Sequence, residues 1–511
     1  MSPNNKRNTE TKLGIVIIAI TALGFLFVTP KLGIFGNRQT DTAQNNNADT
    51  DSSEAPLENS DRQQGNRNLE SRISNGEEIL VGANNNPDKE LAVEAFAKGD
   101  SANALTVFDK SLEAQSNDPE ALIYFNNSIA TIDPHPVKIA VSVPIGGSLD
   151  VAQEILRGVA QAQNEINNAG KGNTMHNGKK HLVQIEIAND DNNPEVATQI
   201  AAEFVSDPEI LAVIGHNSSA ASLAAAPIYE EGNLVMMSPT SVASELTRAG
   251  DRIFRTTPST DILAQTLAGH VIEGGWKRIA ICLDSESPAS SSFSSSFSTS
   301  IFQLGGEIID TSCDFASGEF NPRSVPSEAI ARGAESLLLI PSVDRINQAL
   351  EVAKANDNRL PLFGNHSMYT HQTLRIGQSD VNGMVLPVSW HPESKPNSAF
   401  NREAEKLWGT PSSSWRTASS YDAVMSLAEG LSRAENREQL HSTLASTSFS
   451  ASGVLGKIKF QNTGDRLIKG TLVEVLPAED SSEFKFEPVA RQGKANSSAG
   501  IKTSLAREKE R

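Results

Sequence analysis

Two neighbouring stretches of the sequence decide the fold: Leu211-Ala-Val-Ile-Gly-His-Asn-Ser-Ser-Ala-Ala-Ser222 and Leu234-Val-Met-Met-Ser-Pro-Thr-Ser241. Each stretch begins with a short apolar run and continues into a cluster of hydroxyl-bearing residues. The first then enters a helical pattern of small residues at 223–229. Short apolar runs that alternate with helices are typical of buried strands in a parallel sheet.

The same alternation extends over residues 137–478. Apolar runs occupy 137–143, 182–187, 211–214, 234–237, 278–283, 307–309, 337–340, 361–363 and 383–386. Helical patterns separate them, at 151–169, 194–205, 262–273 and 345–356 among others. Strands that alternate with helices of this length form right-handed βαβ units. The pattern predicts the α/β class, with two doubly wound lobes rather than a single sheet.

The hydroxyl clusters indicate a ligand site. The carboxyl ends of the strands are the edge at which open α/β sheets bind ligands, and helix N-termini favour anions. The alternative is simple capping, which needs one hydroxyl for each helix. Five hydroxyls crowd the two strand ends, which favours the ligand site: Ser218, Ser219, Ser222, Thr240 and Ser241.

Charge and cysteine content exclude several classes of protein. The net charge is −18 and the isoelectric point is near 5.0, whereas a nucleic-acid binder needs a basic surface. The two cysteines, Cys282 and Cys313, are too few for a disulfide scaffold or a four-thiolate zinc site. They form either one disulfide or two free thiols.

Motifs for catalysis and for cofactors are missing from the sequence. The segment 172–180 departs from a phosphate-binding loop, and there is no G-x-S-x-G nucleophile motif. His366 and His371 have no cysteine or carboxylate at metal-ligand spacing. We therefore expect no enzyme, no metal and no cofactor.

The N-terminal segment 1–36 is predicted to be a membrane anchor. Eighteen uncharged residues separate Lys12 from Lys31, enough for a helix of roughly 27 Å. A cleaved signal peptide is the alternative, but no small-x-small cleavage site follows the apolar run. Positive charge before the run places the rest of the chain outside the cytoplasm.

Composition divides the remaining chain. Residues 37–70 are polar and predict a disordered linker, and 479–511 predict a polar tail. Residues 71–132 have helical spacing and resemble a tetratricopeptide repeat; a plain helical hairpin is the alternative. The α/β domain is expected at 133–478, with lobe 1 at about 137–256 and 388–450 and lobe 2 at about 257–387 and 453–478.

Several motifs carry a family resemblance. They are Val213-Ile-Gly-His-Asn-Ser-Ser219, Ile228-Tyr-Glu230, Met237-Ser-Pro239 with Glu245-Leu-Thr247, Thr256-Thr-Pro258, Arg278-Ile-Ala-Ile281, Tyr421-Asp-Ala-Val424 and Ser452-Gly-Val-Leu-Gly-Lys-Ile-Lys-Phe460. Over about 137–477 the chain resembles the branched-chain amino-acid-binding proteins of ABC transporters. The resemblance implies a type I periplasmic-binding fold, whose two lobes are joined by a three-segment hinge and close on a small ligand. It also implies an ABC permease partner in the inner membrane, with the bulk of the chain in the periplasm.

The resemblance also implies binding residues. Ser219, beside Ser218, would bind a ligand carboxylate through its hydroxyl and N–H, and Thr240 and Ser241 would add contacts from the next loop. Lobe 2 would contribute Ser285 and His366.

Three positions depart from the family pattern. Val242 replaces a hydroxyl, Pro288 replaces an aromatic residue, and His366 replaces the acid that pairs with an α-ammonium. A buried ammonium without acceptors is costly. We therefore expect a small carboxylate- or amide-bearing, amino-acid-like ligand, with better binding of acids or amides that lack the α-ammonium.

A second function remains open at this point. A helical module followed by a type I binding fold also resembles the penicillin-binding-protein activators, which use the fold for protein contact. These are usually lipoproteins, and no cysteine precedes Cys282 to carry a lipid. An envelope scaffold or regulator is therefore the alternative to a solute-binding protein.

Overall fold

The structure, a computed structural model, describes residues 69–168, 174–176, 179–409, 413–478 and 483–489. The predicted anchor and almost all of the predicted linker lie outside the described residues, as does most of the polar tail. Among the helices of the described residues, none is both long enough and apolar enough to cross a bilayer.

A six-stranded sheet organises lobe 1. Its strands lie in the order β1-β5-β2-β6-β7-β8, and only β1 is antiparallel to its neighbour. The bounds are β1 Ile73–Ser74, β2 Val137–Val143, β5 Val183–Asn189, β6 Ile210–Ile214, β7 Val235–Ser238 and β8 Ile253–Arg255. The parallel pairing of β2 with β5 and β6, and of β7 with β6 and β8, agrees with the predicted βαβ units.

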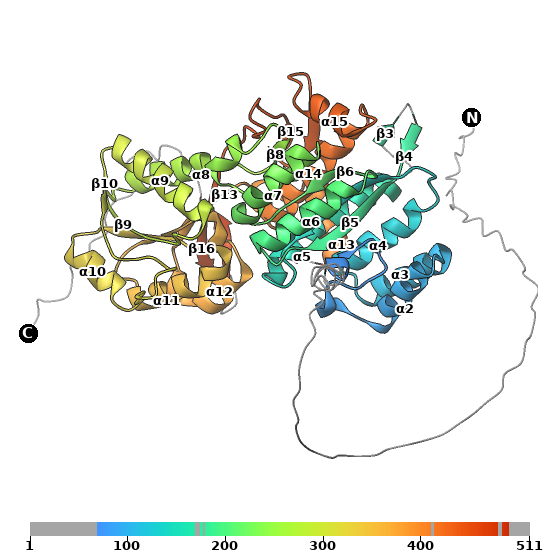
Figure 1. Ribbon diagram of the computed structural model, residues 1–511. Helices are drawn as coiled ribbons and strands as arrows, with labels where there is room; N and C mark the ends of the chain where they lie inside the picture. The colour runs from blue at the N-terminus through green and yellow to red at the C-terminus, as the bar shows by residue number, and fades with distance from the viewer. Residues whose placement is uncertain (1–68, 169–173, 177–178, 410–412, 479–482, 490–511) are drawn as a thin grey trace, which may run out of the picture. The chain divides into compact units, whose positions relative to one another are not determined.

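Helices cover both faces of this sheet (Figure 1). They are α5 Leu149–Asn168, α6 Pro194–Ser206, α7 Ser219–Glu231, α13 Ala399–Trp408, α14 Trp415–Leu431 and α15 Arg437–Leu444. Alternate residues of β2 point to opposite faces: Ile139 and Val141 are buried in one apolar core with Val159, and Ala140 in another with Phe204. Both faces are therefore buried, as a parallel sheet requires.

A seven-stranded sheet organises lobe 2, in the order β10-β9-β11-β12-β13-β16-β17. The bounds are β9 Arg278–Leu283, β10 Glu307–Ile309, β11 Ser336–Ile340, β12 Leu362–Gly364, β13 Val385–Val388, β16 Thr471–Pro477 and β17 Phe484–Pro488. Its helices are α8 Thr260–Glu273, α9 Pro288–Gln303, α10 Val325–Ala331, α11 Ile346–Asn356 and α12 His371–Gly377. The last two strands run antiparallel and close the sheet on one side.

Three segments connect the two sheets, after β8, after β13 and after the hairpin of β14 (Ala451–Gly453) and β15 (Gly456–Ile458). Hydrogen bonds join these segments to each other and to lobe 1. The Thr256 hydroxyl donates to the carbonyl oxygen of Ser419 at 2.8 Å, and Arg255 pairs with Asp465 at 2.5 Å. The predicted class, α/β with two doubly wound lobes, is confirmed.

Helices α2 (Pro87–Ala97), α3 (Ser101–Ala114) and α4 (Pro119–Ala130) precede lobe 1. The side chains of Asn86, Asp100 and Asp118 cap their N-termini. This helical module is fastened to the sheet, because β1 pairs with β5 and the Asn127 side chain bonds both the N–H and the C=O of Ile185, at 2.9 and 2.7 Å. Its resemblance to a tetratricopeptide repeat stays a prediction.

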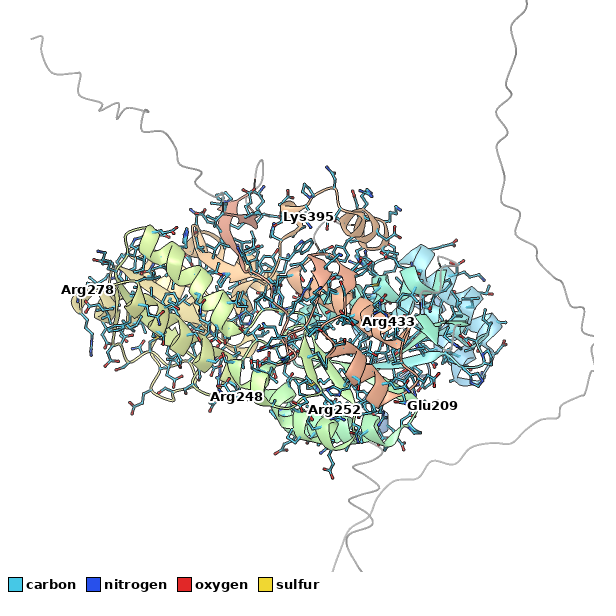
Figure 2. All side chains as sticks on the ribbon, turned by 90° about the horizontal axis from the view of Figure 1, so that it is seen from above. Glu209, Arg248, Arg252, Arg278, Lys395 and Arg433 are labelled. Carbon is cyan, nitrogen blue, oxygen red and sulfur yellow. A yellow bond between two sulfur atoms is a disulfide. The ribbon has the colours of Figure 1, made fainter. Side chains whose placement is uncertain are left out.

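Charged side chains lie on the outside of both lobes. Arg278 lies at the outer edge of lobe 2 in Figure 2, and Arg433 belongs to lobe 1. Their side chains are 42% and 50% exposed. A small hairpin pairs β3 (Thr174–His176) with β4 (Lys179–His181).

Candidate functional site

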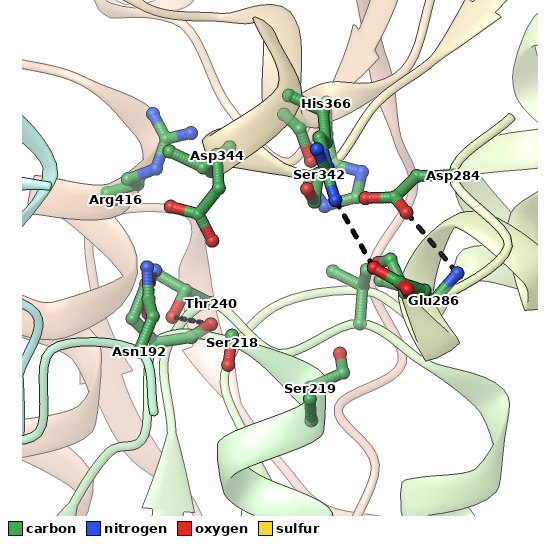
Figure 3. A pocket seen from close by; sticks show the side chains of 18 of the residues that line it. Asn192, Ser218, Ser219, Thr240, Asp284, Glu286, Ser342, Asp344, His366 and Arg416 are labelled. Atoms are coloured by element: carbon green, nitrogen blue, oxygen red, sulfur yellow. Dashed lines mark hydrogen bonds and ion pairs between the residues drawn. The ribbon is translucent and has the colours of Figure 1, made fainter. Parts of the chain in front are cut away.

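A cavity of about 350 Å³ lies between the lobes, at the carboxyl ends of the strands (Figure 3). Lobe 1 lines it with the start of α7, the loop after β7, Asn192 and the start of α14. Lobe 2 lines it with the loops that follow β9, β11 and β12. This is the edge at which open α/β sheets bind ligands.

The N-terminus of α7 forms one side of the cavity. Ser218 is the N-cap, and its hydroxyl oxygen accepts from the N–H of Ala221 at 3.1 Å. Ser219 and Ala220 open the first turn, whose N–H groups have no partner within the helix. Free N–H groups and the helix dipole together favour an anion at this point.

The predicted residues of lobe 1 divide between lining the cavity and bracing its loops. Ser218, Ser219 and Thr240 line the cavity. Ser219 also accepts from the N–H of Ala243 at 3.2 Å, and Thr240 donates to the carbonyl oxygen of Asn217 at 3.0 Å. These contacts hold the loop after β7 against the start of α7.

Ser241 does not line the cavity. It is buried, and its hydroxyl contacts the Ser222 hydroxyl at 2.7 Å and the carbonyl oxygens of His216 and Asn217 at 3.0 and 3.2 Å. The structure therefore gives Ser241 and Ser222 a bracing position behind the cavity wall.

In lobe 2, the predicted His366 lines the cavity and the predicted Ser285 does not. The Ser285 hydroxyl instead donates to Asp314 Oδ2 at 2.6 Å. His366 is 5% exposed, and its Nδ1 has no hydrogen-bond partner in the described chain. Burial, helped by the Arg416 charge, lowers the pKa of His366 to about 3, so the imidazole is neutral at ordinary pH.

Arg416 and Trp415, at the start of α14, line the cavity as well. Arg416 is 2% exposed, and its Nη1 donates to Glu154 Oε2 at 3.0 Å. Its guanidinium lies 4.6 Å from the Trp415 ring centroid, and the Trp415 ring meets His366 edge-on at 5.8 Å. The sequence reasoning missed both residues, although the resemblance at 421–424 marks the same helix.

Four charged residues of lobe 2 face the cavity and were also missed: Asp284, Glu286, Asp344 and Arg345. Arg345 pairs with Glu286 at 3.2 Å. Burial raises the pKa of Asp344, and the nearby negative charge of Asp284 raises it further. The charge of Arg345 and a hydrogen bond with Asn192 oppose that rise. The only sequence signal for these residues was their place directly after the apolar runs 278–283 and 337–340.

A disulfide between Cys282 and Cys313 lies behind the loop after β9, which decides between the two states left open by the sequence. Leu283 exchanges backbone hydrogen bonds with this segment, donating to Cys313 at 3.2 Å and accepting from Phe315 at 2.8 Å. Asp314 in turn accepts from the N–H and the hydroxyl of Ser285. The disulfide therefore holds the segment that positions Asp284 and Glu286.

A profile of the periplasmic binding protein family matches residues 136–474. The chain belongs to this family. Over 171 residues this periplasmic binding protein is 32% identical to the Leu/Ile/Val-binding protein of Escherichia coli K12, a match that covers 32% of this chain. The chain spans less than half of that relative, 43% of its length.

Two longer matches agree with the family. The leucine-specific-binding protein of Salmonella typhimurium is 25% identical over 349 residues, which cover 64% of this chain and 88% of that protein. A solved structure of an ABC transporter substrate-binding protein from Desulfitobacterium hafniense in complex with Leu is 25% identical. It covers 69% of this periplasmic binding protein and 100% of its own chain, with a TM-score of 0.58. The resemblance drawn from the sequence motifs, and the type I fold it implied, are confirmed.

Metal binding finds no support in the described part of the chain, where no three His, Cys, Asp or Glu side chains are grouped to hold an ion.

Proposed function

We propose that this periplasmic binding protein captures a small, carboxylate-bearing, amino-acid-like ligand between its lobes for an ABC-type importer. The observation that carries the proposal is the α7 N-terminus, whose first-turn N–H groups at Ser219 and Ala220 border the cavity beside two hydroxyls. An anion at that position gains charge-assisted hydrogen bonds. The names of the relatives, two of which bind leucine, support an amino-acid-like ligand.

Closure of the hinge would complete the site. The three connecting segments allow the lobes to rotate toward each other, as in other two-lobed binding proteins. A ligand held by lobe 1 would contact His366 and the charged loops of lobe 2 across the same cavity. The closed, loaded form is the one that a permease would recognise.

Membrane attachment belongs to the same proposal. Binding proteins of this family act outside the cytoplasm, and the apolar run at 13–28 would tether this one to the inner membrane. N-terminal sequencing of the mature protein tests the tether. A mature chain that begins downstream of Pro30 would contradict it.

Ligand screening tests the binding function itself. A thermal-shift screen of the whole chain with amino acids, small carboxylates and amides should give at least one hit. A ligand at a hundred times its Kd stabilises the folded state by about 2.7 kcal/mol, which a melting curve resolves. If no compound shifts the melting temperature, the envelope scaffold becomes the better explanation of the fold.

A further inference from the structure

The two cations of the cavity already have partners. Arg345 pairs with Glu286 at 3.2 Å. Arg416 pairs with Glu154 at 3.0 Å. Two other carboxylates, those of Asp284 and Asp344, line the cavity without a cationic partner among the described residues. Across the described chain, no nitrogen of Lys, Arg or His lies within 4.0 Å of either carboxylate.

Asp284 is the more deeply buried of the two residues. Its residue is only 3% exposed, and Oδ1 accepts one long hydrogen bond, 3.3 Å, from the N–H of Glu286. A buried carboxylate normally has an opposite charge or several hydrogen bonds. Asp284 has neither and borders the cavity, so it is placed to accept a cation from there.

Asp344 lies on the accessible side of the same cavity. In Figure 3 its carboxylate points across the cavity toward Asn192 and the Ser218 side of lobe 1. Closing the lobes on a neutral ligand would remove water from this group without replacing it by a cation. Closing them on a cation would pair the charge.

Few apolar side chains line the cavity. They are Ala220, Val242, Ala289, Val343 and Trp415. Cavities for aliphatic ligands are lined mainly by hydrophobic and aromatic side chains. A ligand side chain that reaches the loops of lobe 2 would meet the carboxylates of Asp284, Glu286 and Asp344.

We infer that the cavity selects an amino acid with a cationic side chain, with Asp284 and Asp344 as the residues that determine this specificity. The inference rests on the proposed function. The ligand carboxylate would occupy the α7 N-terminus, and its two cationic groups would pair with the two carboxylates. This differs from the ligand without an α-ammonium that Val242 and His366 suggested in the sequence.

Isothermal titration calorimetry of the whole chain tests the inference with L-lysine, L-arginine, L-norleucine and L-leucine. Norleucine matches the carbon chain of lysine without the side-chain ammonium. We expect lysine or arginine to bind at least tenfold more tightly than norleucine. Asp344→Asn and Asp284→Asn should each weaken lysine binding. The ratio should fall severalfold toward one in the variant that removes the partner of the side-chain cation, and the other variant should weaken lysine and norleucine alike.

Asp344→Asn is the milder of the two variants, because Asp344 is exposed whereas Asp284 is buried. Glu319→Gln, at an exposed carboxylate of lobe 2 outside the cavity lining, is the control and should leave the ratio unchanged. Equal affinity for lysine and norleucine, or an unchanged lysine affinity in Asp344→Asn, would overturn the inference. Tight binding of leucine alone would also overturn it while leaving the proposed function intact, whereas binding of no small molecule would remove both.

Discussion

Arg416 and Tyr369 are joined across the two lobes, because Arg416 Nη1 donates a 2.8 Å hydrogen bond to the backbone carbonyl oxygen of Tyr369. Arg416 begins α14 of lobe 1, and Tyr369 ends the loop after β12 that carries His366. The same guanidinium lines the cavity and pairs with Glu154. One side chain therefore links the ligand cavity, the start of α14 and lobe 2.

Arg416→Gln should weaken both the fold and the closed form. The variant removes the charge that pairs with Glu154, and breaking a buried pair costs about 3–5 kcal/mol. Glu154 is 21% exposed, so we expect about 2–3 kcal/mol in urea unfolding. The radius of gyration by small-angle X-ray scattering should shrink less when ligand is added.

The double variant Arg416→Gln with Glu154→Gln is the matched control for this prediction. It removes the unpaired carboxylate and should recover much of the stability, but not the link to Tyr369. Normal closure in the double variant would show that the lobe-to-lobe bond is unimportant.

Ser219→Ala should reduce ligand affinity roughly tenfold to a hundredfold. A hydrogen bond to a charged partner is worth about 1.5–3 kcal/mol. Stability without ligand should fall by only about 0.5–1.5 kcal/mol, through the lost contact with the N–H of Ala243. Calorimetry and urea unfolding separate the two effects.

Ser241→Ala should lower the stability of the fold more than it lowers ligand affinity. Its hydroxyl braces two carbonyl oxygens behind the cavity, so stability falls more than affinity. The assignment of Ser219 to the ligand fails if both variants bind ligand like the parent chain.

The sequence predicted the strands that hold the site far better than it predicted the lining. Its nine apolar runs coincide with β2, β5, β6, β7 and β9 to β13, because consecutive apolar residues buried on both faces leave a strong local pattern. The two-residue β1 leaves no pattern, since its pairing depends on the distant β5.

Helix α9 shows a different limit. It carries eight serines among sixteen residues, which weakens any helical propensity. Phe293, Phe297 and Ile301 are nevertheless fully buried at a spacing of four. Tertiary packing of that stripe, rather than local preference, makes the segment helical.

The cavity lining shows the third limit. Ser218 and Ser219 follow an apolar run directly, so their position at a strand end was readable. Asp344 and Arg416 come from segments that meet only when two lobes fold and face each other. The hydrophobic periodicity of one segment does not predict which distant segments it will contact in the folded chain.

Removing the disulfide should destabilise lobe 2 and weaken binding. Cys282 and Cys313 close a loop of 31 residues, for which chain entropy gives about 3–4 kcal/mol. The double variant Cys282→Ala with Cys313→Ala should show that loss in urea unfolding. Its ligand affinity should fall as well, because the segment at Asp314 holds the loop that carries Asp284.

A reductant supplies the control. A phosphine that reduces the parent chain should reproduce the defects of the double variant and should leave the double variant itself unchanged. Full stability of the double variant would contradict a structural role for the disulfide.

Acid should destabilise the fold through two buried histidines. Burial lowers the pKa of His366 to about 3 and that of His391 to about 4. Above about pH 6.5 both folded and unfolded chains carry neutral imidazoles. Below it, the unfolded chain binds protons first, so each histidine costs up to about 1.4 kcal/mol of stability per pH unit until the folded pKa is reached.

His391→Gln should remove one of these two contributions. The slope of unfolding free energy against pH between 6 and 5 should therefore decrease relative to the parent chain. His135→Gln, at an exposed position, is the matched control and should leave the slope as it was. An identical slope in His391→Gln would show that this imidazole does not resist protonation in the folded chain.

Lys89 should hold the helical module together. Its ammonium lies 2.7 Å from both Asp118 and Glu120, and all three side chains are 0% exposed. The two carboxylates raise the pKa of Lys89 against the effect of burial, so the charged form persists. Lys89→Met leaves both carboxylates buried without a cation, which should cost about 3–5 kcal/mol.

Two controls separate the charge from the packing. Lys98→Met breaks a pair with Glu94 in the same helix, but both side chains are mostly exposed, and no measurable change is expected. Adding Asp118→Asn and Glu120→Gln to Lys89→Met removes the stranded charges. The amide oxygens can still accept from the N–H groups of Ala121 and Leu80, but the buried NH2 groups beside Met lack acceptors, so stability should return only in part.

Hydrogen exchange would show how far the damage in Lys89→Met spreads. Because β1 pairs with β5 and Asn127 bonds the same strand, protection should fall in α2 to α4 and at the β5 edge of lobe 1. The helices of lobe 2 should exchange as in the parent chain. Loss confined to α2 to α4 would mean that the module is a separate unit, and unchanged exchange throughout would mean that the buried triad contributes no stability.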